Sequence, residues 1–236
     1  MSLKRALVVV AKEPVAGQTK TRLSPPLAPE EAVALYRCFL LDTLDLMARV
    51  EGVDPLIAYT PHTAEGYFRR LAPDGFALMP QVGASLGQRL DHVLTRCLEG
   101  GYDQAAVMNS DGPTLPVEYL GQAFEYLDDP HVDVVLGPSE DGGYYLIALK
   151  RPCAALFDVE MSTPTVCQET LALAHSQGLR VVCLDSWYDI DTPEDLDRLI
   201  KELSLLPSWV AVRTRRFLRR FDLAWKSSRG LGFPSR

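Results

Sequence analysis

Apolar residues recur along this chain with two different spacings. Short continuous apolar runs, the first of them RALVVVA at residues 5–11, are typical of strands buried on both faces of a parallel sheet. They predict strands at residues 5–11, 55–60, 76–80, 105–108, 132–137, 144–149 and 180–184. Apolar positions three and four apart predict helices at residues 29–50, 64–71, 85–98, 117–127 and 162–177, and another that starts at Thr192. Because the two patterns alternate, we expect a single three-layer α/β/α domain with a mostly parallel sheet.

The charge of the chain changes sign near residue 207. The whole sequence has 24 Lys and Arg against 31 Asp and Glu, a net charge of -7. Eight of the cations but only one of the acids lie in residues 207–236, which leaves 16 basic and 30 acidic residues before them, a net of -14. We therefore expect a catalytic domain over residues 1–206 and a basic, partly helical tail over 207–236. An acidic domain argues against general nucleic-acid binding, which needs a cationic face.

The tail has the pattern of a basic amphipathic helix. Four apolar residues fall close to one helical face: Phe217, Leu218, Phe221 and Trp225. Arginines lie mostly beside them, as in helices that bind membrane surfaces. Such a helix is a candidate for peripheral contact with a membrane or a partner. The alternative is a helix that closes the domain or contacts a second subunit. The sequence leaves the oligomeric state open.

Composition and cysteine usage indicate a cytoplasmic protein. The chain is 47% hydrophobic, enough to bury a full core. Its five cysteines lie far apart with no CxxC pair, which argues against a disulfide framework and against a zinc site. No apolar run approaches the roughly 20 residues of a membrane span, and the N-terminus has no signal-peptide pattern.

The loop after the first strand is rich in cations. Three of them lie between positions 12 and 22: Lys12, Lys20 and Arg22. The loop is not a P-loop, because Thr19 and Pro14 occupy the positions where that motif requires glycine. We expect a loop that binds phosphates mainly with side chains, and Gly17 would let the backbone approach closely. The alternative is an ordinary solvated basic loop.

Two further segments follow predicted strands. Asn109-Ser110-Asp111 ends an apolar run, so Asp111 is expected at the C-terminal end of a central strand, where it could hold a divalent cation. The alternative is a helix cap for the helix at residue 117. Ser85 is expected to cap the start of a helix whose free N–H groups suit an anion or a base edge, against the alternative of a plain glycine-rich turn.

Acidic residues gather at two more turns. Glu140 and Asp141 precede two glycines, and either acid could serve as a general base or bind sugar hydroxyls. The alternative is a hairpin whose Asp-Gly turn needs left-handed dihedrals. Near the C-terminus a capping box explains Thr192 and the residues after it. It leaves Asp189 and Asp191 unexplained, in a position to complete a metal site with Asp111.

These segments in this order resemble a known family. AKEPVAGQTKTRL, QVGASLGQRL, NSDGPTLP, GPSEDGGYYLIAL, MSTPTV and DIDTPEDL are similar to segments of small bacterial GT-A-like glycosyltransferases, including those of arsenosugar biosynthesis. The likeness extends, more distantly, to the 2-phospholactate guanylyltransferases and the molybdenum cofactor nucleotidyltransferases. It implies a nucleotide-diphospho-sugar transferase fold with Mg²⁺ or Mn²⁺ bridging the diphosphate of a bound nucleotide.

The resemblance also implies roles for particular residues. The residues that match nucleotide-binding positions are Lys12, Gly17, Lys20, Arg22, Gln81 and Arg89. Asp111 matches the metal aspartate, and Asp191 the second metal aspartate of related cytidylyltransferases. Asn109 stands where an aspartate-x-aspartate motif has its first acid, which makes Asp191 more important as the partner of Asp111.

Three hypotheses for the function follow. The first is glycosyl transfer from a nucleotide sugar to a small acceptor, with metal on Asp111 and with Asp141 as the acid that orients or deprotonates the acceptor hydroxyl. The second is nucleotidyl transfer, in which Lys20 and Arg22 bind a triphosphate while a phosphorylated acceptor displaces pyrophosphate. The third is a non-catalytic nucleotide or nucleotide-sugar binding protein.

Overall fold

The computed structural model describes residues 3–228, with side chains to residue 221, and separates into two compact units. Within this range, unit 1 comprises residues 3–13 and 43–189, and unit 2 comprises residues 14–42 and those from 190 onward. The chain leaves the sheet after its first strand and packs in unit 2 with its last two helices. The expected division at residue 206 stays a prediction.

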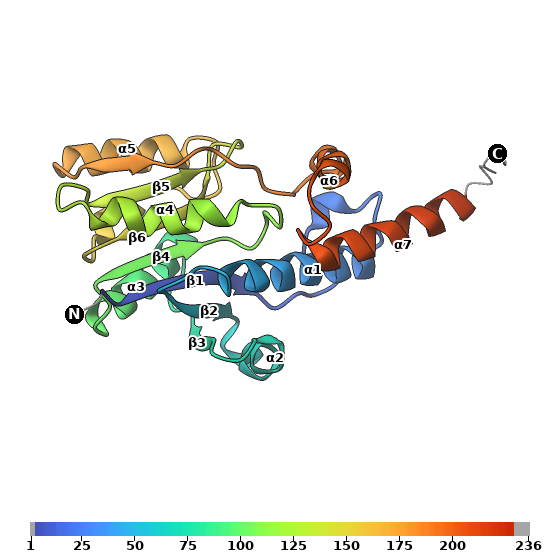
Figure 1. Ribbon diagram of the computed structural model, residues 1–236, viewed down its shortest axis with the longest axis horizontal. Helices are drawn as coiled ribbons and strands as arrows, with labels where there is room; N and C mark the ends of the chain where they lie inside the picture. The colour runs from blue at the N-terminus through green and yellow to red at the C-terminus, as the bar shows by residue number, and fades with distance from the viewer. Residues whose placement is uncertain (1–2, 229–236) are drawn as a thin grey trace. The chain divides into compact units, whose positions relative to one another are not determined.

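Unit 1 is built on a seven-stranded sheet with the order β3-β2-β1-β4-β6-β5-β7 (Figure 1). The strands are β1 (Arg5–Lys12), β2 (Asp54–Thr60), β3 (Ala77–Pro80), β4 (Gln104–Met108), β5 (Val134–Pro138), β6 (Tyr144–Leu149) and β7 (Val181–Cys183). Only β6 runs antiparallel to its neighbours, β4 and β5. The predicted α/β fold with a mostly parallel sheet is confirmed, and each predicted strand end lies within two residues of the observed one.

Helices cover the sheet of unit 1 because alternate strand residues point to opposite faces. One face packs against α3 (Leu86–Glu99), the 3-10 turn η3 (Ala154–Phe157) and α5 (Val166–Ser176), around residues such as Val8 and Val107. The helix α4 (Val117–Asp128) contacts β4, β5 and β6. The helix expected from residue 162 begins only at Val166, because Ser162 adopts a left-handed φ of 66° that no α-helix contains.

The remaining helices are α2 (Glu65–Leu71), preceded by the 3-10 turn η2 (His62–Ala64), and three long helices that lie wholly or partly in unit 2. The latter are α1 (Pro29–Met47), α6 (Pro193–Leu205) and α7 (Val212–Ser228); a 3-10 turn, η1 (Thr21–Leu23), precedes α1. The predicted capping box of α6 is present, with the Thr192 hydroxyl accepting from the Asp195 N–H and the Asp195 carboxylate accepting from the Thr192 N–H. No described helix is long and apolar enough to cross a bilayer.

The predicted tail helix exists as α7. Leu218 is buried and the rings of Phe217 and Phe221 stack at 6.4 Å, so these three residues lie close to one face of the helix, as predicted. The side chain of Trp225 and residues 229–236 lie outside the described part of the chain.

Candidate active site

Polar residues of unit 1 gather at one edge of the sheet. Because β6 is antiparallel to both β4 and β5, these two strands are parallel to each other, and all strands but β6 end at the same edge. Ligands bind at this edge in open α/β sheets. The strand ends there and the segments that follow them carry Lys12, Gln81, Asn109, Asp111, Ser139, Asp141 and Asp189.

Asn109 connects two of these segments. Its amide nitrogen donates to both carboxylate oxygens of Asp189, at 3.0 Å each, and its amide oxygen accepts from the Asp111 N–H at 3.3 Å. The Ser139 hydroxyl also donates to Asp189, at 3.3 Å. An aspartate at position 109 could only repel Asp189, so asparagine is the residue that lets the turn after β4 bind this carboxylate.

The turn after β4 packs directly on the segment that follows β7. A Cβ atom on Gly112 would lie 3.4 Å from the Tyr188 carbonyl oxygen and 3.9 Å from a carboxylate oxygen of Asp189. The indole N–H of Trp187 is buried beside this contact and makes no hydrogen bond with the described residues. A buried donor without a partner costs stability, which makes it a candidate for binding a substrate oxygen.

The described residues fit a divalent cation that takes much of its coordination from substrate. No group of three or more His, Cys, Asp or Glu side chains in the described part of the chain could hold a metal by itself. The same sheet edge does present two carboxylates, Asp111 and Asp189, and the second is held in place by Asn109 and Ser139. One or two carboxylates completed by phosphate oxygens is the usual coordination of Mg²⁺ in nucleotide sites.

The Asp141 turn is the hairpin that the sequence offered as an alternative. It joins β5 to β6, Gly142 has a φ of 91°, and the exposed Asp141 carboxylate accepts from the Gly143 N–H at 3.0 Å. Gly142 is also pressed against the start of α5, because a Cβ there would lie 1.8 Å from the Pro164 carbonyl oxygen. The hairpin explains the sequence of this turn, and the catalytic role of Asp141 stays a prediction.

Gln81 and Arg89, both predicted to bind nucleotide, differ in how far the fold already uses them. The buried Gln81 side chain donates to the carbonyl oxygens of Ala11 and Ala58, tying together the ends of β1 and β2. Arg89 lies in the first turn of α3, and its Nε is buried without a hydrogen-bond partner among the described residues. The predicted Ser85 cap of α3 is confirmed by its bond from the Gln88 N–H.

In unit 2 the two loop cations meet a single carboxylate. Lys20 donates to one oxygen of Asp191 at 2.8 Å, and Arg22 donates to the other at 2.7 Å. The Lys20 side chain is 7% exposed and that of Arg22 68% exposed. Gly17 and Lys20 both adopt a left-handed φ, of 74° and 47°. The loop is therefore not simply solvated, since it is fixed by this ion-pair network.

The surroundings of Asp191 set its charge. Burial by itself raises the pKa of this carboxyl, but the charge and hydrogen bond of Lys20 together with the charge of Arg22 outweigh burial and hold the pKa below its usual value. The backbone N–H of Asp191 donates to Asp195 in the capping box of α6, which orients the residue. Asp191 is thus an anion that positions two cations.

The structure brings together some predicted site residues and adds others. Asp111 lies in unit 1 and Asp191 in unit 2, so their pairing on one metal ion stays a prediction. Asp189 takes part in the unit 1 site. The sequence left both Asp189 and Asp191 unexplained, and nothing in it indicated that Asp189 would bind Asn109. Ser139 and Trp187 were missed. Ser139 lies in the segment GPSEDGGYYLIAL, where the two acids took the attention, and Trp187 lies in none of the recognised segments; the bridge between these two residues places them together at the site.

The fold and the polar strand ends define the class of nucleotide-diphospho-sugar transferase folds. A candidate nucleotide-diphospho-sugar transferase from Desulfovibrio desulfuricans G20 has a similar structure, with a TM-score of 0.84 and 32% identity over 94% of this chain and 96% of that one. The chain itself belongs to the family described as "Uncharacterized protein conserved in bacteria (DUF2064)", whose model matches residues 43–163.

Curated relatives extend the similarity to enzymes. The chain is 29% identical over 197 residues to the 2-phospho-L-lactate guanylyltransferase of Archaeoglobus profundus, which is 82% of each chain. It is 26% identical over 215 residues, 89% of each chain, to the enzyme of that name from Methanothermobacter thermautotrophicus. The resemblance found in the sequence is therefore confirmed, both in its fold and in its link to the guanylyltransferases.

Proposed function

We propose that this chain is a nucleotidyltransferase that passes the nucleoside monophosphate part of a triphosphate, in the first instance GTP, to a small phosphorylated acid. The observation that carries this choice is the similarity to two guanylyltransferases over 82% and 89% of the chain. Glycosyl transfer, the first hypothesis from the sequence, is the second candidate, favoured by the similarity to a candidate nucleotide-diphospho-sugar transferase.

In the proposed reaction an oxygen of the acceptor phosphate attacks the α-phosphorus of the triphosphate. The bond from the α-phosphorus to the oxygen that bridges it to the β-phosphate breaks, and pyrophosphate leaves with the electron pair. Donor, acceptor and leaving group are all anions, so catalysis depends on fixed cations and on positioning rather than on a general base.

Lys20 and Arg22 are assigned to the phosphates of the donor. Their shared bond to Asp191 fixes both cations before a ligand arrives, which lowers the entropy lost on binding. Arg22 is largely exposed and can reorient toward a phosphate, whereas Lys20 is nearly buried and keeps its place. Arg89, with its unpartnered Nε at the start of α3, is assigned to a further phosphate or to the base.

A divalent cation, Mg²⁺ or Mn²⁺, is assigned to Asp111 with Asp189 as the second carboxylate. Bound there, it would neutralise charge on the phosphates of the donor and on the departing pyrophosphate. Asn109 and Ser139 would keep Asp189 oriented whether or not the ion is present.

Asp141 separates the two candidate reactions. An acceptor phosphate is already ionised near neutral pH and needs no base, whereas a sugar hydroxyl does. Asp141→Asn keeps an oxygen that can accept from the Gly143 N–H, so the turn is preserved while the base is removed. Nucleotidyl transfer should survive this substitution, and glycosyl transfer should lose most of its rate, about 100-fold or more.

The test is a product assay with purified full-length protein and Mg²⁺ or Mn²⁺. Release of pyrophosphate is measured from each of the four nucleoside triphosphates with 2-phospho-L-lactate and other phosphorylated acids. Release of nucleoside diphosphate is measured from nucleotide sugars with hydroxyl acceptors. Acceptor-dependent pyrophosphate supports the proposal, acceptor-dependent nucleoside diphosphate supports the second candidate, and tight binding with neither product indicates a binding protein.

A further inference from the structure

The last described helix presents a face of arginines to solvent. Successive helical residues turn by about 100°, so positions 212, 216, 219 and 220 lie within roughly a third of the circumference. This exposed arginine face consists of Val212, Arg216, Arg219 and Arg220. Thr214 and Leu218 lie on the opposite side and are buried. The arginine face is therefore the outer side of a helix that is anchored by its inner side.

A neighbouring arginine, Arg215, has a structural task. Its guanidinium donates to four carbonyl oxygens, that of Leu203 in the last turn of α6 and those of three residues between α6 and α7: Leu206, Pro207 and Val210. These bonds satisfy the free carbonyl groups at the end of α6. They also fasten the segment of residues 203–210 beside α7, so whatever this segment exposes lies next to the arginine face.

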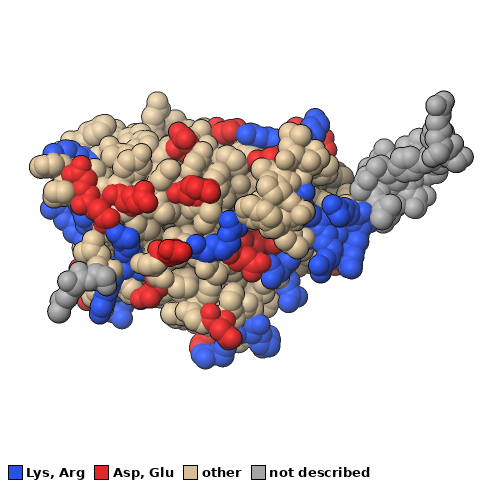
Figure 2. Space-filling view, viewed as in Figure 1, with Lys and Arg blue, Asp and Glu red and all other residues tan. Residues whose placement is uncertain are grey.

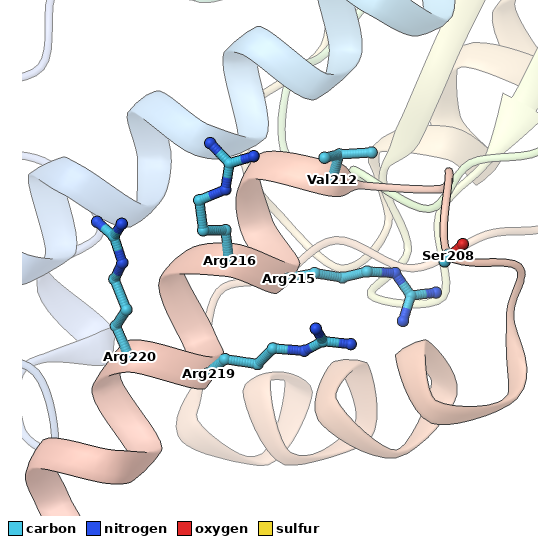
Figure 3. A pocket seen from close by; sticks show the side chains of 6 residues that line it. All are labelled: Ser208, Val212, Arg215, Arg216, Arg219 and Arg220. Atoms are coloured by element: carbon cyan, nitrogen blue, oxygen red, sulfur yellow. The ribbon is translucent and has the colours of Figure 1, made fainter.

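The arginine face is not neutralised by the described residues. No described side chain forms a salt bridge with Arg216, Arg219 or Arg220. A hollow of ≈ 290 Å³ is lined by Ser208, Val212, Arg215, Arg216, Arg219 and Arg220. Figure 3 shows these side chains, with Arg215 and Arg219 extending toward Ser208. Burial and then the charge of Arg219 lower the pKa of Arg215. Figure 2 shows basic side chains gathered on the surface where α7 lies in Figure 1.

Exposed apolar side chains accompany these charges. Three of the eight large apolar residues that the described chain exposes fall within residues 205–212: Leu205 (86% exposed), Trp209 (59%) and Val212 (41%). A cluster of this kind marks an interaction surface more often than chance exposure does. Tryptophan beside arginine is the combination found at the boundary between water and lipid headgroups.

We propose that the arginine face of α7 and the exposed apolar residues 205–212 form a docking surface for an anionic lipid bilayer. The arginines bind the phosphates of lipid headgroups, and Leu205, Trp209 and Val212 enter the layer beneath them. The distribution of charge supports this occupant, because residues 1–206 carry a net charge of -14 and an anionic bilayer repels them while it attracts the tail. The molecule would therefore meet the bilayer through α7.

A bilayer fits this surface better than a free polyanion does. Nucleic acid or a free phosphate would use the arginines but would leave Leu205 and Val212 exposed to water. Burying apolar area provides binding energy that only an occupant with an apolar layer can supply.

The test is co-sedimentation of the full chain with vesicles. Vesicles of phosphatidylcholine alone are compared with vesicles that also contain phosphatidylglycerol. We expect sedimentation with the anionic vesicles only, weakened by salt because exposed charges are screened. Each arginine near an anionic surface contributes roughly a fivefold factor in partitioning, so Arg219→Gln with Arg220→Gln should weaken binding about 25-fold.

Matched variants distinguish binding through this surface from a general effect of the protein's positive charges. Arg70→Gln with Arg96→Gln removes two exposed cations from unit 1 and should leave binding within about twofold, since far charges are screened. Trp209→Ser should weaken binding, whereas Tyr126→Ser, which removes an exposed aromatic ring from α4, should not. Absence of sedimentation with anionic vesicles overturns the proposal, as does equal loss in both arginine pairs. Displacement by inorganic triphosphate together with unchanged binding of Trp209→Ser would instead show a simple anion site.

Discussion

The carboxylate of Asp191 links the cation loop to the start of α6. Its folded-state pKa is lowered, so between the folded and unfolded pKa values the unfolded chain binds more protons. The stability that this group contributes is therefore present above about pH 4 and is lost as pH falls through the folded-state pKa.

Asp191→Asn should cost about 1–2 kcal/mol at neutral pH, because Lys20 and Arg22 lose a charged partner. The variant should then lose less stability than the parent between about pH 5 and pH 3, since the titrating group is gone. Thermal unfolding followed by circular dichroism at both ends of this range measures the effect. Asp74→Asn, an exposed aspartate in no described salt bridge, is the control, and an equal change in its acid limb would contradict the interpretation.

Gly142 cannot be replaced without moving the chain around it. A side chain there would meet the Pro164 carbonyl, and the left-handed φ of 91° is unfavourable for any residue but glycine. Gly142→Ala should destabilise the protein by about 3 kcal/mol or more. Gly121→Ala, in the interior of α4 with no atom near the added methyl group, should instead stabilise it by about 0.5–1 kcal/mol. Urea unfolding of both variants decides whether the clash at Gly142 is real.

At the scale of the elements, α7 begins where α1 provides a cap. The buried Asp42 carboxylate of α1 accepts from the N–H groups of Arg213 and Thr214, at 3.0 and 2.8 Å. These N–H groups belong to the first turn of α7, and the N–H groups of a first turn have no hydrogen-bond acceptors within their own helix. An interhelical cap of this kind holds the arginine face in position from a distant part of the sequence.

Asp42→Ala should destabilise unit 2 by about 1–3 kcal/mol, because a buried and a partly buried N–H group lose a charged acceptor. Asp45→Ala, one turn along α1 and exposed, should have an effect within about 0.5 kcal/mol. Limited proteolysis that cleaves α7 faster in Asp42→Ala than in the control would confirm the cap. Equal cleavage rates would show that α7 does not depend on it.

At the scale of the whole molecule, ligand binding should appear as stability. A ligand at 100 times its dissociation constant adds about 2.7 kcal/mol to the free energy of unfolding. For a chain of this size, GTP with Mg²⁺ or Mn²⁺ should therefore raise the melting temperature by roughly 5–10 °C. Asp111→Asn should abolish the part of this shift that depends on metal and lower turnover on the order of 100-fold.

The controls for this measurement are the other triphosphates and nucleotide sugars. A larger, metal-dependent shift with a nucleotide sugar than with GTP would contradict the proposed donor and favour glycosyl transfer. If the metal-dependent shift in melting temperature is unchanged in Asp111→Asn, Asp111 is not a metal ligand. The description of the fold would not be affected by this result.

The sequence by itself determined the order of the strands and helices and the strand limits to within two residues, because hydrophobic periodicity is a local property of each segment. The helix limits were less exact, since α5 begins at Val166 rather than at residue 162. It also placed Lys12, Gln81, Asp111 and Asp141 at strand ends, since each follows an apolar run. The cap residues Ser85 and Thr192 were predictable for the same reason, as their partners lie three residues away.

Only the tertiary structure decided the partners of the charged side chains. Asn109 meets Asp189 across 80 positions of the sequence, Lys20 meets Asp191 across 171, and Asp42 caps a helix that begins 170 residues later. A hydrogen bond forms only within about 3 Å, so it depends on which segments the fold brings together. Local pattern carries no record of that distance, so the ion pairs of Asp191 with Lys20 and Arg22 follow from the tertiary structure alone, and the role of Asp191 as a metal ligand stays a prediction.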